Sequence, residues 1–215
     1  MRILITGASK GLGLVACQFF HDHEGHTVLR VSQSLGLKWD GSEVDAVIHT
    51  AGGGMGLRGP YIPAQSLYEL FMLNLGNAIE LDRLILPSMQ ARKSGHVVHV
   101  CSIASGEAIG NVGYNTMKAA LAAYVRSIGR ELAPYGVVVS GIAPGGFVAS
   151  GGAMERLARA NPVAYLEFTS KRLPRGFMGK AEEILPLLKF LISPEASMMG
   201  GCVVPIDAGE GHYYT

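Results

Sequence analysis

The chain opens with MRILITGASKGLG, residues 1–13, and the rest of the sequence is best understood from this stretch. Arg2 to Thr6 is a short apolar run typical of a buried strand, and Gly7 to Gly13 contains three glycines. From Leu12 onward, apolar residues recur at intervals of three and four, which is the spacing of one helix face. A strand, a glycine-rich turn and a helix in this order predict the first unit of a parallel α/β sheet.

The remaining segments alternate between strand-like and helix-like patterns. We expect strands at 26–32, 45–50, 96–101, 137–142 and 202–206, and a short strand with a turn at 35–41. We expect helices at 12–24, 63–92 with a break near Gly76, 112–133 and 182–191, and one or two short helices within 147–178. The pattern predicts one α/β domain, residues 1–215, with a doubly wound parallel sheet and helices on both faces.

Length and composition exclude several classes of protein. The 215 residues are 48% hydrophobic and 16% charged, so the chain buries a full core and is not disordered. Eighteen Lys and Arg against seventeen Asp and Glu give a net charge of +1, which argues against nucleic acid and anionic membranes as partners. No apolar run is long enough for a signal-peptide core or a membrane span, so we expect a cytoplasmic protein.

Cysteines and histidines give no sign of a disulfide framework or a metal site. Cys17, Cys101 and Cys202 lie far apart and form no CxxC pair, so we expect buried thiols in a reducing compartment. HDHEGH at residues 21–26 has the composition of a metal cluster, but it falls between a helix and the next strand, away from the expected ligand edge. We interpret it as a solvated turn and expect no bound metal.

In a doubly wound sheet, ligands bind outside the carboxyl ends of the strands. The residues that follow the expected strands are 7–13, Ser32, 50–54, Ser102 and 144–150. The glycines of 7–13 would let a pyrophosphate approach the backbone, and the helix behind them offers free N–H groups and its positive dipole end. A tight turn without a ligand would use the same glycines, but the strand before it and the helix after it favour a nucleotide site.

Tyr114 and Lys118 lie four residues apart on the expected helix at 112–133 and therefore share one face. A free tyrosine has a pKa near 10, so only about 0.1% is ionised at pH 7, and a nearby ammonium favours the phenolate. The pair could therefore exchange a proton near neutral pH. Alone, such a pair is usually structural. Ser102 could likewise cap a helix or loop, and the Asn74 side chain could form a hydrogen bond at an interruption of its helix.

Together these motifs resemble the short-chain dehydrogenase/reductase family. TGASKGLG at 6–13 is similar to the family's TGxxxGxG cofactor turn, Ser102 to its catalytic serine, and Tyr114 with Lys118 to its YxxxK motif. The resemblance covers essentially the whole chain and implies a Rossmann-like fold.

Further motifs extend the resemblance in the same order along the chain. Ala51-Gly52 is similar to the end of the family's NAG motif, and Pro144-Gly145 to the PG after its sixth strand. Asn74 in LNLG is similar to the asparagine of the family's catalytic tetrad.

Four features depart from the family pattern. Thr50 replaces the NAG asparagine, Ala149 replaces a threonine that touches the nicotinamide carboxamide, and the final Asp-Gly-Gly is Asp207-Ala208-Gly209. The region between residues 32 and 45 is so short that one helix looks deleted and one sheet edge reduced.

The resemblance implies a role for each residue of the tetrad. Tyr114 exchanges a proton with the substrate oxygen, Lys118 lowers the tyrosine pKa and holds the ribose, Ser102 binds the carbonyl oxygen, and Asn74 holds a water that links Lys118 to solvent. The cofactor-binding residues implied by the resemblance are Gly7, Ser9, Lys10, Gly11, Leu12, Ser32, Ala51, Gly52, Tyr114, Lys118, Pro144 and Gly145.

The second strand bears on the choice of cofactor. Members of the family that prefer NAD carry an acidic residue at its end, where this chain has Ser32. Members that prefer NADP often carry a basic residue where this chain has Lys10, and Arg30 is a second candidate unless it points into the sheet. We therefore expect NADP, with NAD as the alternative.

These observations predict an oxidoreductase that moves a hydride between NADP(H) and a small-molecule carbonyl or alcohol. The main alternative is a non-catalytic NADP-binding redox sensor or scaffold, although such a protein would have no need of Ser102 and Tyr114. A nucleotide-sugar epimerase or dehydratase would need a larger C-terminal domain than 215 residues allow. We expect residues 147–178 to form a substrate lid, and the family resemblance implies a homodimer or homotetramer.

Overall fold

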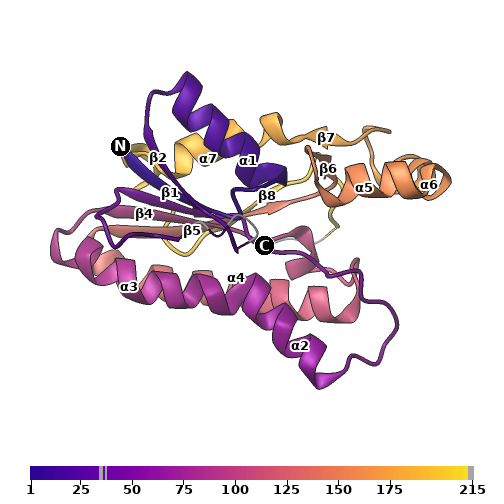
Figure 1. Ribbon diagram of the computed structural model, residues 1–215, viewed down its shortest axis with the longest axis horizontal. Coiled ribbons are helices and arrows are strands. Elements are labelled where there is room, and N and C mark those ends of the chain that lie inside the picture. Colours follow the sequence, from indigo (N-terminus) through magenta and orange to yellow (C-terminus); the bar gives the residue numbers. More distant parts are fainter. Residues whose placement is uncertain (34–35, 37, 213–215) are drawn as a thin grey trace.

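The central sheet has six parallel strands. The computed structural model describes residues 1–33, 36 and 38–212, and in these the strands follow the order β2-β1-β3-β4-β5-β8 (Figure 1). All five neighbouring pairs are parallel, and every long strand that the sequence predicts is present. The bounds are Arg2–Thr6 (β1), Thr27–Val31 (β2), Ala46–His49 (β3), Gly95–Val100 (β4), Val137–Pro144 (β5) and Val203–Ile206 (β8).

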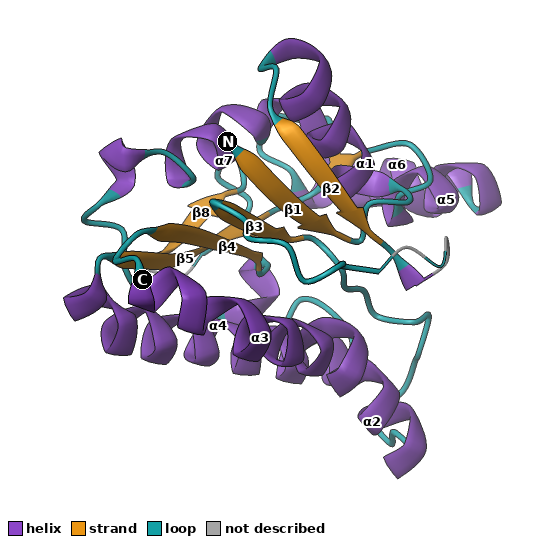
Figure 2. Ribbon diagram, turned by 60° about the vertical axis from the view of Figure 1, so that its left-hand side comes forward, coloured by secondary structure: helices purple, strands orange, loops and turns teal. Residues whose placement is uncertain are grey.

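Helices cover both faces of this sheet, which confirms the doubly wound architecture (Figures 1 and 2). One face carries α1 (Gly11–Gln18), extended by a π-helical turn at Phe19–His23, and α7 (Leu185–Leu191). The other face carries α3 (Asn77–Ala91) and α4 (Val112–Leu132). Short 3-10 helices lie at Ile103–Ser105, Ala133–Tyr135, Ala181–Glu183 and Pro194–Ala196. Within the described ranges no helix is both long and apolar enough to cross a bilayer.

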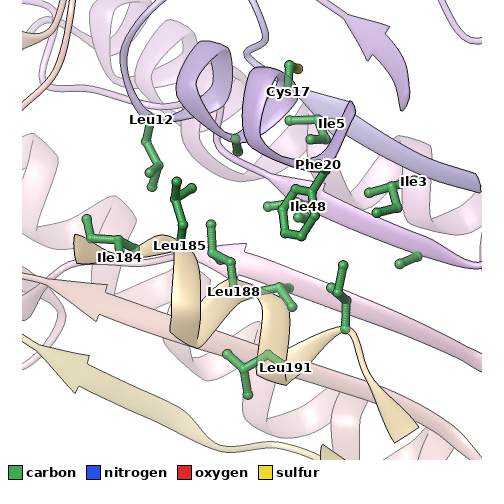
Figure 3. Close-up of a cluster of buried hydrophobic side chains, with 14 of the residues drawn as sticks. Ile3, Ile5, Leu12, Cys17, Phe20, Ile48, Ile184, Leu185, Leu188 and Leu191 are labelled. Atoms are coloured by element: carbon green, nitrogen blue, oxygen red, sulfur yellow. The ribbon is translucent and has the colours of Figure 1, made fainter. Parts of the chain in front are cut away.

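Alternating strand residues build a separate core on each face. Ile3 and Ile5 of β1 pack with Leu188 of α7, together with Phe20 from the end of α1 (Figure 3). Leu4, between the two isoleucines, belongs to the opposite core with Ile85, Leu86 and Met89 of α3. A strand that is apolar at consecutive positions therefore buries both of its faces, as expected for a parallel sheet between two helical layers.

The predicted break near Gly76 is confirmed. α2 (Ala64–Phe71) passes into α3 through a π-helical turn at Met72–Gly76, which contains Asn74. A Cβ on Gly76 would lie 2.7 Å from the sulfur of Met72, so a larger residue would disturb the turn. Single π-helical turns occur frequently at functional sites, and this one places Asn74 at the carboxyl edge of the sheet.

A small outer unit holds the two short helices predicted within 147–178. α5 (Ala153–Ala160) and α6 (Pro162–Arg172) extend from one end of the sheet (Figure 1). They are framed by β6 (Phe147–Val148) and β7 (Gly179–Lys180), which form a two-stranded parallel sheet.

The connection from β2 to β3 differs from our expectation. We predicted a short strand within 35–41, but positions 35 and 37 lie outside the described residues and positions 36 and 38–41 carry no strand. The strand order places β2 at the edge of the sheet and β3 on the other side of β1. Trp39 donates its indole N–H to the Ser42 carbonyl at 2.9 Å and packs with Val44 against β2, so the segment covers apolar surface without a helix.

Candidate active site

The strand order reverses beside β1, because the chain goes from β1 to β2 on one side and then to β3 on the other. A crevice at the carboxyl ends of the strands forms at such a reversal, and the glycine turn lies there. Gly7 and Gly11 have φ values of +67° and +62°, which favour glycine. A Cβ on Gly7 would lie 2.7 Å from the amide nitrogen of Ala51, so the turn packs closely on the end of β3.

The amino end of α1 is suited to bind an anion. Lys10 occupies the cap position of the helix in an extended conformation, and no side chain caps the first turn. The N–H groups of that turn that follow Gly11, together with the helix dipole, therefore favour a bound anion. Gly11 N–H donates to the Ser150 carbonyl at 2.7 Å, so the segment after β6 lies against the turn. Backbone shape and polarity here fit a pyrophosphate.

Two basic side chains lie at this turn. Lys10 is exposed, and Arg30 of β2 donates from Nη2 to the Ala8 carbonyl at 3.1 Å. Arg30 therefore reaches the glycine turn, and does not point into the sheet core. Ser32, at the end of β2, is buried. The position where the resemblance leads us to look for an acidic residue thus carries a small buried hydroxyl.

Thr50 keeps β3 joined to β1. Its hydroxyl donates to the Thr6 carbonyl at 2.7 Å. The departure from the asparagine of the NAG motif therefore keeps a hydrogen bond between the ends of the two strands that flank the crevice.

Asn74 and Lys118 meet beneath Gly52. A Cβ on Gly52 would lie 2.9 Å from Asn74 Oδ1 and 3.1 Å from Lys118 Nζ. Asn74 accepts from Gly53 N–H and donates to the Gly53 and Leu70 carbonyls, at 2.9 to 3.0 Å. The bond to the Leu70 carbonyl satisfies a backbone acceptor beside the π-helical turn. Asn74 therefore stabilises the helix interruption and also contacts the site.

Tyr114 and Lys118 share the inner face of α4. Lys118 is 3% exposed, donates from Nζ to the Val100 carbonyl at 2.7 Å, and lies 5.8 Å from the centre of the Tyr114 ring. Tyr114 is half-buried near the first turn of the helix, which Asn111 caps. The structure therefore places the ammonium and the phenol ring on one face of the helix, one turn apart.

Ser102 follows β4 at the same edge. Its hydroxyl accepts from Ala104 N–H at 3.1 Å and caps the short helix Ile103–Ser105, against which α4 packs. The cap therefore holds the serine at the start of the short helix that packs against α4. The structure brings all four tetrad candidates to one edge of the sheet.

The segment after β5 is held by a residue that the sequence analysis missed. Glu210, 3% exposed, accepts from Gly146 N–H and pairs with Arg172 of α6 at 2.6 Å. Arg172 also donates to the Ile109 carbonyl at 3.4 Å, in the loop before Tyr114. The pair joins the region after Pro144-Gly145, the outer helices and the Ser102–Tyr114 loop. Its members are 38 residues apart in sequence, and no local pattern indicates them.

Two cavities adjoin this region. One of about 360 Å³ lies between residues 145–147 and 173–184 and is lined by apolar groups including Phe147, Phe177 and Ile206. A second, of about 270 Å³, is bordered by Ser150, Glu155 and Lys180 beside the glycine turn. None of the tetrad candidates lines either cavity, so we assign neither to the substrate.

The structure gives the burial of the cysteines and of the HDHEGH segment. Cys17 and Cys101 are buried, and burial raises the pKa of both thiols to about 11. Cys202 is exposed, contrary to our expectation, because it lies just before the edge strand β8. His21 and His23 are exposed at the end of a π-helical turn, as predicted.

A buried polar cluster beneath the tetrad was also missed. It comprises His49 of β3, Asp82 of α3, His99 of β4 and Tyr124 of α4, and we call it the Asp82 cluster. Burial opposes ionisation of Asp82, but His49 and His99 beside it hold the pKa of its carboxyl below the usual range. Burial lowers the pKa of His99 despite the nearby carboxylate, and burial and Asp82 raise the pKa of Tyr124 far above its usual value.

These shifts predict that acid destabilises the fold. The pKa of His99 and of His96 is lower in the folded chain than the usual 6.5, so below about pH 6.5 the unfolded chain binds more protons. Stability is therefore present above pH 6.5 and is lost as pH falls, by at most about 1.4 kcal/mol per pH unit for each histidine. We expect the unfolding free energy in urea to fall between pH 7 and pH 5, and His96→Asn to reduce that slope, whereas His23→Asn does not. An unchanged free energy across this range would contradict the assignment.

Comparisons with known proteins agree with this geometry. A family model described as "Enoyl-(Acyl carrier protein) reductase" matches residues 24–210. The 3-oxoacyl-[acyl-carrier-protein] reductase MabA of Mycobacterium avium is 28% identical over 97% of this chain and 89% of its own length. Cyclohexanol dehydrogenase of Rhodococcus sp. (strain TK6) is 28% identical over 93% of this chain and 74% of its own.

A solved structure gives the same result for the fold. The crystal structure of an oxidoreductase of the short-chain dehydrogenase/reductase family from Burkholderia thailandensis superposes with a TM-score of 0.85 at 24% identity, over 97% of this chain and 91% of the other. The family match, the named relatives and the shared fold lead to one conclusion: the chain belongs to the short-chain dehydrogenase/reductase family and is an NAD(P)-dependent oxidoreductase.

Proposed function

We propose that this enzyme is a ketoreductase or alcohol dehydrogenase that uses NADP(H), with Tyr114 as the proton donor and acceptor. The observation that carries the proposal is the position of the Lys118 ammonium. It is buried, fixed by the Val100 carbonyl, adjacent to Asn74, and 5.8 Å from the Tyr114 ring centre. Such an ammonium favours loss of the tyrosine proton during the reaction.

In the reductive direction, the residues of the chain handle the oxygen and the proton. When bound, the reduced nicotinamide supplies a hydride to the carbonyl carbon. The C=O electron pair moves to oxygen, which takes the Tyr114 hydroxyl proton while the Ser102 hydroxyl holds the oxygen in place. The phenolate left on Tyr114 is stabilised by Lys118, and Asn74 would hold the water through which a proton returns from solvent.

We infer that residues 147–178 form the substrate lid. Helices α5 and α6 lie at the carboxyl edge of the sheet, and the Arg172–Glu210 pair ties α6 to the segment after β5. The Ser150 carbonyl accepts from Gly11 N–H, so this region already contacts the glycine turn. A lid in this position would exclude water from the hydride transfer.

The cofactor preference gives a first prediction. Lys10 and Arg30 lie at the glycine turn, and the 2′-phosphate of NADP would add charge-assisted contacts there. We expect NADPH to bind more tightly than NADH, and Lys10→Ala to narrow the ratio of the two dissociation constants by about tenfold. Fluorescence titration measures the dissociation constants of NADPH and NADH. Lys189→Ala on α7 is the matched control and should leave their ratio unchanged. Equal affinities in the wild type would remove the basis for the preference.

Assembly gives a second prediction. Leu84 of α3 and Val112 of α4 are more than half exposed, and we propose that these helices pair across a two-fold axis into a homodimer or homotetramer. Sedimentation should show an assembly at micromolar concentration, shifted toward monomer by Leu84→Glu and unaffected by Leu166→Glu on α6. A wild-type monomer of 22.7 kDa would contradict this.

A substrate screen tests the function itself. The panel would follow NADPH oxidation with 3-oxoacyl thioesters, cyclic ketones and other small carbonyl compounds. The first class is suggested by the name of the 3-oxoacyl-[acyl-carrier-protein] reductase, and the second by that of cyclohexanol dehydrogenase. Turnover that is lost in Tyr114→Phe supports the proposal. Tight NADPH binding without turnover of any compound would favour the redox-sensor alternative.

A further inference from the structure

One carboxylate connects four elements directly below the site. Asp82 is 1% exposed, and its Oδ1 lies 3.0 Å from His49 Nε2. Its Oδ2 lies 3.0 Å from the Tyr124 hydroxyl and 3.2 Å from His99 Nε2. The groups come from α3, β3, α4 and β4. The contacts from His49 and Tyr124 have hydrogen-bond geometry, whereas His99 Nε2 approaches the carboxylate without it. A buried carboxylate with two such partners is held in a narrow range of positions, and so are the partners.

Each partner of Asp82 is directly linked to a residue of the site. His49 precedes Thr50, and its Nδ1 lies 3.4 Å from the hydroxyl of Thr6, the residue before the glycine turn. His99 precedes Val100, whose carbonyl accepts from Lys118 Nζ. Tyr124 is on α4, the helix that also carries Tyr114 and Lys118. The Asp82 cluster therefore connects the ends of β1, β3 and β4 to the helix with the proton donor.

The ring geometry does not favour a metal ion. The carboxylate and the two imidazole nitrogens lie within 4.8 Å of one another, which is the composition of a metal site. However, the rings of His49 and His99 are stacked, with centroids 4.6 Å apart and planes 17° from parallel. Lone pairs in nearly parallel planes do not converge on one ion about 2 Å from each nitrogen. The carboxylate itself occupies the position between the two Nε2 atoms.

We propose that Asp82 is a positioning residue for the reductase reaction: through His49, His99 and Tyr124 it fixes β3, β4 and α4 so that Lys118 and Ser102 face Tyr114. This inference rests on the proposed function. The charged and titratable groups around it are His49 on β3, His99 on β4 and Tyr124 on α4, with Lys118 in electrostatic range of His99. Asp82 is linked to the ammonium through His99, which interacts with both groups.

The main test is Asp82→Asn, which keeps the shape and removes the charge and one acceptor oxygen. We expect kcat to fall at least tenfold, KM for NADPH to change less than threefold, and the pH profile of kcat to move toward lower pH, because loss of a nearby negative charge favours the phenolate. A merely structural role would lower melting temperature without moving the pH profile. Glu80→Gln, exposed on the same helix, is the matched control and should behave as wild type.

A second measurement does not depend on activity. Nitrogen-15 NMR of labelled histidine should show the His49 and His99 side-chain signals moved in Asp82→Asn, because both rings lose their carboxylate partner. If Asp82→Asn fails to fold, Tyr124→Phe keeps the carboxylate and should lower kcat about threefold and move the same signals. Failure of the proposed function would leave the NMR result intact. Wild-type kcat and pH profile in folded Asp82→Asn, or stoichiometric zinc in the wild type that Asp82→Asn loses, would overturn the proposal.

Discussion

Replacing Tyr114 by phenylalanine is expected to lower kcat at least a hundredfold while NADPH still binds. The substitution removes one hydroxyl and keeps the ring. The cap of α4 is unaffected, because there the Tyr114 backbone N–H donates to the Asn111 side chain. General acid catalysis typically contributes 10²- to 10⁴-fold, which sets the expected loss. Steady-state kinetics on the best substrate, together with fluorescence titration of NADPH, measures both quantities.

Tyr135→Phe is the matched control, because Tyr135 is an exposed tyrosine in the turn after α4. It should leave kcat unchanged. Near-normal turnover in Tyr114→Phe would mean that another group donates the proton, and the tetrad assignment would be wrong.

Replacing Lys118 by methionine is expected to reduce turnover by a similar factor and also to weaken NADPH binding. Methionine keeps most of the side-chain volume but removes the ammonium that stabilises the phenolate and would hold the ribose hydroxyls. The Val100 carbonyl loses its donor as well, so a lower melting temperature should accompany the kinetic defect. A simultaneous loss of turnover and affinity distinguishes this residue from Tyr114.

Lys189→Met controls for the loss of one positive charge, since Lys189 pairs with Glu24 and lies on α7, which covers the opposite face of the sheet from α4. Ser102→Ala gives a third phenotype, with lower turnover and little change in NADPH affinity, because the serine would contact the substrate oxygen and not the cofactor. Unchanged NADPH affinity in Lys118→Met would contradict a role for this residue at the ribose.

The sequence predicts the sheet well, and it predicts that the four tetrad candidates follow the sheet to one edge, because both have local signatures. Apolar runs of four to six residues identify β1, β3 and β4, and the residues just after parallel strands must meet at one edge. The break near Gly76 was likewise visible in the LNLG segment. The segment 35–41 was misjudged, because a short apolar run does not show whether a neighbouring strand is available for pairing.

Contacts between single residues far apart in sequence could not be predicted. Asp82 is separated by 33 residues from His49, and Glu210 by 38 from Arg172. A charged residue within a helix pattern is usually solvent-exposed, and only the packing of α3 on the sheet places Asp82 in the core. For the same reason the direction of the Arg30 side chain became clear only from its bond to Ala8.

The most direct test of the central claim is the fate of the hydride in a single turnover. The enzyme would be mixed with a reactive ketone and NADPH deuterated at the transferred position of C4, and the product analysed by mass spectrometry. The proposed mechanism predicts deuterium on the carbinol carbon for the wild type, at a rate at least a hundredfold lower in Tyr114→Phe. Deuterium transfer at equal rates in both proteins, or oxidation of NADPH without deuterium in the product, would contradict the mechanism.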